Sequence, residues 1–81
     1  MRTETFEFNL DDTASMVRML IKQLESYRTI TQHPEELEWE IRVYQYILKD
    51  PEKRLMEYGQ ARRSQKVSKR MAIAKLGWDI P

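Results

Sequence analysis

The stretch GQARRSQKVSKRMAIAKLGW, residues 59–78, holds the pattern on which the fold of this chain depends. It contains six of the fourteen Lys and Arg residues of the chain, and neither Asp nor Glu. Apolar residues that recur at spacings of three and four indicate one face of a helix, and here they are Val67, Met71, Ala74 and Trp78. The other side carries the basic residues Arg62, Lys66, Lys69 and Arg70, with Arg63 near its edge. The pattern predicts an amphipathic helix that docks on the protein by its apolar side.

The apolar pattern changes side at Gly59, one of only two glycines in the chain. With about 100° of rotation per residue, Leu55 and Tyr58 lie on the side of a continuous helix that the basic residues would continue. Two explanations are open. Either a short helix ends at Gly59 and another begins a few residues later, or the helix runs on and its far end reaches another partner. We expect the break, with helices over residues 51–58 and 61–76.

Two further helices are predicted before this region, over residues 12–29 and 34–49. The first has its start signal in Asp11, Asp12 and Thr13, whose side chains suit an N-cap and the helix dipole, and the second has Pro34 in its first turn. Each carries an apolar stripe at helical spacing, made of Val17, Leu20, Leu24 and Tyr27 and of Leu37, Ile41, Tyr44 and Leu48. Because the connection between the two is short, we expect them to form an antiparallel hairpin.

The N-terminal residues TETFEFNL alternate between apolar and polar side chains, with Phe6, Phe8 and Leu10 on one side. Such alternation predicts a half-buried strand over residues 1–10. A strand needs a neighbour for its backbone groups, and an extended arm that covers the helices is the alternative. With 81 residues the chain suits a single domain. The expected fold is mainly α, with three to four short helices and a short N-terminal strand or extended arm.

Composition narrows the class of protein. The chain has no cysteine, which excludes a disulfide framework and a thiolate metal site and favours a cytoplasmic setting. No apolar run is long enough to span a bilayer, so no membrane partner is expected. Charge is uneven, because residues 1–60 carry a net charge of −4 and residues 61–81 a net charge of +5. That asymmetry indicates an anionic partner, unless the acidic and basic parts attract each other within one fold.

Catalytic chemistry has little support in the sequence. The single histidine, His33, lies in a polar turn before Pro34, where a capping or solvated role is typical. With two glycines the chain has no glycine-rich phosphate loop. The acids from Glu35 to Glu40 fan around a helix start rather than converge on a cation. We therefore expect no enzyme activity, no cofactor, no metal site and no small-molecule substrate.

Two functions remain. The first is a small helical interaction or regulatory module that acts by protein–protein contact, as a dimer, through the candidate interface residues Phe6, Phe8, Trp39, Val67, Met71 and Trp78. The alternative is a nucleic-acid-binding module that uses the basic residues Arg62, Arg63, Lys66, Lys69 and Arg70. The same basic row also suits an acidic protein, or a solvated face that pairs with the acids of residues 35–40. A compact helical chain without catalytic groups is also typical of phage-like accessory proteins.

Overall fold

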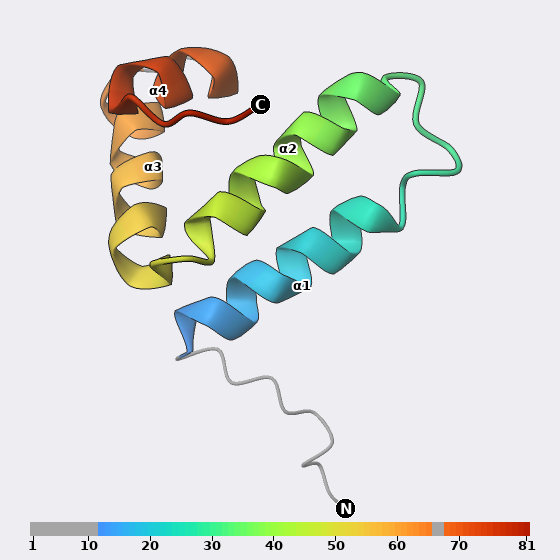
Figure 1. Cartoon of the computed structure of the whole chain (residues 1–81), viewed down its shortest axis with the longest axis horizontal. Coiled ribbons are helices and arrows are strands. Elements are labelled where there is room, and N and C mark those ends of the chain that lie inside the picture. The colour runs from blue at the N-terminus through green and yellow to red at the C-terminus, as the bar shows by residue number, and fades with distance from the viewer. Residues whose placement is uncertain (1–11, 66–67) are drawn as a thin grey trace, which may run out of the picture.

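The computed structural model describes residues 12–65 and 68–81. These form four α-helices, which are α1 (Thr13–Glu25), α2 (Pro34–Ile47), α3 (Pro51–Gln65) and α4 (Lys69–Leu76). The first two run antiparallel as the predicted hairpin, α3 stands across its open end, and α4 crosses the far end of α3 (Figure 1). The mainly helical fold is thus confirmed. Residues 1–11, which hold the predicted strand or arm, lie outside the described residues.

Local start signals account for the positions of the helices. The Asp12 carboxylate caps α1, because it accepts hydrogen bonds from the Ala14 N–H at 3.1 Å and the Ser15 hydroxyl at 3.0 Å. Pro34 and Pro51 each occupy the first position of a helix, where the missing N–H of proline costs nothing. The hairpin begins at Asp12, where the sequence predicts. Its first helix is shorter than predicted, because α1 ends at Glu25 and residues 26–30 form turns.

The predicted break at Gly59 is wrong. Helix α3 passes through Gly59 and continues to Gln65, so the helices predicted over 51–58 and 61–76 are divided elsewhere. A glycine inside a helix costs only about 1 kcal/mol relative to alanine, and the residues around Gly59 keep the helix intact. The new start lies at Ser68, whose hydroxyl caps α4 by accepting the Met71 N–H at 3.3 Å.

This division also changes which side of the basic segment is buried. A helical wheel drawn from residue 61 to residue 76 assumes one helix, but α4 is a separate helix with its own orientation. It buries Ala72 and Ile73, whereas Met71 is 53 % exposed and Ala74 is exposed too. The predicted docking side is therefore wrong for both Met71 and Ala74, and Val67 lies outside the described residues.

The core is built around α2. In the described part of the chain, half of the ten buried hydrophobic residues come from this helix, and the remainder come from the other three. The α2 residues are Leu37, Trp39, Ile41, Val43 and Ile47, and the others are Val17, Ile21, Tyr58, Ala72 and Ile73. Side chains from all four described helices pack together in one cluster, and α3 contacts both α1 and α4 directly. Helix α2 contributes most of the cluster without separating the others.

The C-terminal residues end α4 and pack against the core. Gly77 adopts a left-handed conformation with φ of 75° and ends α4, as the sequence predicts, and its N–H donates to the carbonyls of Ile73 and Ala74. The chain then turns back toward α2 (Figure 1). There Trp78 packs on Tyr46 and Tyr58, with ring centroids 5.1 and 6.1 Å apart.

Candidate interaction surfaces

The one histidine of the chain lies on the surface. His33 is exposed at the N-cap of α2 and lines a shallow hollow with residues 32–36. Over residues 12–65 and 68–81, no group of three or more His, Asp or Glu side chains is placed to hold a metal ion. In the same residues, no helix is both long and apolar enough to cross a membrane.

Two of the five predicted basic residues point toward α2 instead of outward. Lys69 pairs with Glu40, and the Arg70 guanidinium bonds both carboxylate oxygens of Glu36, at 3.1 and 3.2 Å. The same guanidinium lies 4.1 Å from the centre of the buried Trp39 ring. The hydrogen bond from Arg70 lowers the pKa of the Glu36 carboxyl below its ordinary value. These contacts are the internal pairing with the acids of residues 35–40 that the sequence left open.

Arg62 is the third basic residue and lies where α2, α3 and α4 meet. Its Nε atom is buried, as is the hydroxyl oxygen of Tyr58, and neither has a hydrogen-bond partner in the described part of the chain. Burial raises the pKa of Tyr58, and the nearby Arg62 guanidinium lowers it by less. Burial also raises the pKa of Tyr44, whose ring meets that of Tyr58 edge-on at 6.1 Å.

The two remaining basic residues are Arg63 and Lys66. Arg63 is exposed on the last turn of α3, and Lys66 lies outside the described residues. The row that the sequence predicts as one outward face is therefore not presented as a unit. Lys69 and Arg70 pair with carboxylates of α2, and Arg62 is half-buried beside Tyr58 of its own helix.

The predicted interface residues also separate. Trp39 is only 5 % exposed and belongs to the core, so its place does not suit an anchor for a partner. Trp78 is half-buried against its own chain. Met71 is exposed on the outer side of α4 and is available for contact. Phe6, Phe8 and Val67 lie outside the described residues.

The loop between α1 and α2 presents a surface that the sequence pattern does not predict. Tyr27 is 51 % exposed and Ile30 is 70 % exposed, and together they form what we call the loop tip. Tyr27 falls in the apolar stripe predicted for the first helix, but the helix ends two residues earlier and leaves its ring on the surface. An apolar Ile30 between two threonines was the signal available in the sequence.

The loop that carries the loop tip has backbone hydrogen bonds of its own and an ion pair to α2. The N–H groups of Ile30 and Thr31 both donate to the Tyr27 carbonyl, at 3.1 and 2.9 Å. The Arg28 guanidinium binds both oxygens of Glu38, at 2.7 and 2.9 Å, and so ties the loop to α2. That hydrogen bond lowers the pKa of Glu38.

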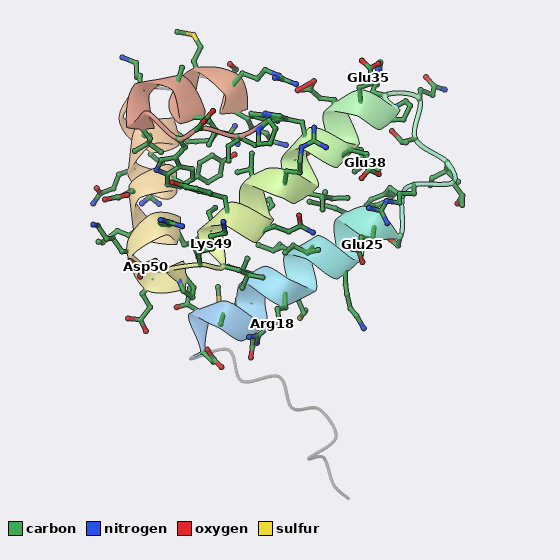
Figure 2. The ribbon with its side chains drawn as sticks, in the orientation of Figure 1. Arg18, Glu25, Glu35, Glu38, Lys49 and Asp50 are labelled. Carbon is green, nitrogen blue, oxygen red and sulfur yellow. The ribbon has the colours of Figure 1, made fainter. Side chains whose placement is uncertain are left out.

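Carboxylates gather at the same end of the hairpin, where Glu25, Glu35 and Glu38 lie around the loop (Figure 2). The loop tip is thus an apolar pair at an acidic end of the molecule. In comparisons with known proteins, the chain matches no family model, no curated protein and no solved structure.

Proposed function

We propose that this chain is a non-enzymatic interaction module that acts by contact between protein chains and associates as a dimer. The observation that carries the proposal is the loop tip, where Tyr27 and Ile30 are largely exposed on a loop fixed by backbone hydrogen bonds and a bidentate ion pair. A loop that is already ordered loses little conformational entropy when it binds. Aromatic residues such as tyrosine are common anchors of protein interfaces.

The small core supports the same proposal. A chain of this size buries only about 60 % of the surface that its unfolded form exposes, and association of two copies is a common way to add burial. Within the described residues, no observation favours the nucleic-acid alternative, since Lys69 and Arg70 already pair with Glu40 and Glu36. Duplex DNA titrated at low salt remains the direct test of that alternative.

The proposal is tested by measuring mass against concentration with sedimentation equilibrium. We expect the unmodified chain to form dimers, and Ile30→Asp to raise the dissociation constant about tenfold or more, because a carboxylate replaces an apolar contact. Thr29→Asp is the matched control, since it adds the same charge at an adjacent exposed position and removes no apolar side chain. A chain that stays monomeric at all concentrations, or equal weakening by both variants, would contradict the proposal.

A further inference from the structure

An open hollow lies between the second half of α2 and the last residues of the chain, and we call it the C-terminal hollow. Its volume is about 270 Å³, and it is lined by Arg42, Gln45, Tyr46 and Lys49 from α2 and by residues 79–81. All of these residues are exposed or half-buried, so another molecule can reach them. Because a cavity of about 150 Å³ already holds a six-carbon ring, the hollow has room for a side chain from a partner.

The lining of the hollow is held in place by contacts within the chain. The Tyr46 ring packs on Trp78 with centroids 5.1 Å apart, and the Arg54 guanidinium lies 4.1 Å from the centre of the same ring. The Arg42 side chain donates to the carbonyl of Pro81 at 3.1 Å and so joins α2 to the C-terminal residues. A surface that is already ordered loses little conformational entropy when it binds.

The charges of the hollow complement those beside the loop tip. Two cations, Arg42 and Lys49, and one carboxylate, Asp79, line the hollow, and in the described part of the chain neither cation pairs with a carboxylate. Glu25 and Glu35 lie near the loop tip and also have no ion pair within residues 12–65 and 68–81. Figure 2 shows Lys49 and these two glutamates at opposite ends of the hairpin. Each copy therefore offers an acidic apolar projection and a more basic hollow.

We infer that the C-terminal hollow of one copy receives the loop tip of a second copy. The loop tip then lies against the ring of Tyr46 and the side chain of Ile80, and its neighbouring acids lie near Lys49. Opposite charges on two surfaces favour this orientation and speed association. Because each copy has one loop tip and one hollow, a two-fold axis that joins one such pair joins the other as well, and the dimer is closed. The loop tip is the contact of the proposed function, on which this inference rests, and the hollow is the surface that it meets.

Other surfaces in the described part of the chain suit the loop tip less well. The hollow at residues 32–36 is lined by two carboxylates and by no Lys or Arg. The hollow between Glu57 and Leu76 is lined by one carboxylate and again by no Lys or Arg. Contact between two loop tips would bring the same glutamates together. Like charges in all three arrangements oppose association, which leaves the C-terminal hollow as the better match.

Thiol cross-linking tests the contact directly, because the chain has no cysteine of its own. One variant carries Thr29→Cys beside the loop tip and another carries Gln45→Cys in the hollow, and both positions are exposed. With a short bifunctional thiol reagent, we expect an equal mixture of these two variants to cross-link about tenfold faster than a mixture of Thr29→Cys and Gln23→Cys, since contact raises the effective concentration of the thiols. Gln23 is the matched control, because it is exposed on α1 and does not line the hollow.

Two results of the cross-linking would overturn the inference. Equal rates in the two mixtures would show that the hollow has no preference for the loop tip. Links mainly between two Thr29→Cys copies would show contact of tip with tip, which removes the hollow from the dimer and leaves the proposed function standing.

Sedimentation equilibrium of a charge variant gives a second measurement. Lys49→Glu should raise the dissociation constant of the dimer about fivefold or more, because an attraction to the acids beside the loop tip becomes a repulsion. Lys53→Glu makes the same charge change at an exposed position outside the hollow and should have a smaller effect. If Ile30→Asp weakens the dimer while Lys49→Glu does not, the hollow is not the contact and the proposed function survives. A chain that is monomeric throughout contradicts both.

Discussion

At the scale of single residues, Tyr58 shows how a buried polar group is tolerated in this core. Its side chain is 5 % exposed, its ring packs on Tyr44 and Trp78, and its hydroxyl oxygen is buried without a hydrogen-bond partner in the described residues. An unpaired buried hydroxyl costs about 1–3 kcal/mol. The ring therefore stabilises the fold while the hydroxyl opposes it.

Tyr58→Phe should for this reason leave the free energy of unfolding unchanged or raise it by up to about 1 kcal/mol. Burial raises the pKa of Tyr58 above its ordinary value, so its neutral form stabilises the fold below that value and the stabilisation is lost as pH rises through the folded pKa. The variant should thus lose less stability than the unmodified chain in alkaline solution. Urea unfolding across alkaline pH measures both effects, with the exposed Tyr27→Phe as the control. A clear loss of stability at neutral pH would show that the hydroxyl has a partner.

At the scale of elements, the two glycines have opposite roles. Gly59 lies inside α3 without a positive φ, and a Cβ there would meet only the Arg63 guanidinium at 3.8 Å. Gly77 ends α4 with φ of 75°, a conformation that costs other residues about 1–2 kcal/mol. The same substitution should therefore have opposite signs at the two positions.

Gly59→Ala should raise the free energy of unfolding by about 0.5–1 kcal/mol, because alanine loses less entropy inside a helix. Gly77→Ala should lower it by about 1 kcal/mol. Chemical denaturation of the two variants beside the unmodified chain measures both values. If Gly59→Ala destabilised the chain instead, α3 would be broken at Gly59 as the sequence pattern suggests.

The ends of the helices show which features of this fold can be predicted from the sequence. Asp12, Pro34, Pro51 and Gly77 act on their own backbone within one turn, so the helix ends they mark are readable from the sequence. Tyr58, next to Gly59 in α3, packs on Tyr44 and Trp78, and a helical wheel contains no such tertiary contact. A helical wheel drawn for one continuous helix also predicts that Met71 is buried, whereas Met71 is exposed on α4. The sequence allows the pairing of Lys69 and Arg70 with Glu40 and Glu36 as one of several possibilities, because that pairing depends on where α4 lies relative to α2.

At the scale of the whole molecule, the four described helices share one core, against which the C-terminal residues Trp78 and Ile80 pack. Trp78 contacts α2 through Tyr46 and α3 through Tyr58, and the Arg42 side chain donates to the carbonyl of Pro81 at 3.1 Å. Residues distant in sequence are thereby held together at the point where α4 returns toward α2. Trp78 thereby adds apolar contact between the C-terminal residues, α2 and α3.

Trp78→Ala should therefore lower the free energy of unfolding by about 2–3 kcal/mol, somewhat less than the 3–5 kcal/mol typical of a fully buried tryptophan, because Trp78 is only half-buried. Asp79→Ala is the control, since its exposed side chain should matter by less than about 0.5 kcal/mol. Chemical denaturation gives both values, and amide hydrogen exchange locates the effect. Faster exchange is expected in α4 and in the second half of α3, while α1 and α2 keep their protection. Equal stability of the two variants would mean that the C-terminal residues do not join the helices, and that α4 is held to α2 by its ion pairs with Glu36 and Glu40 alone.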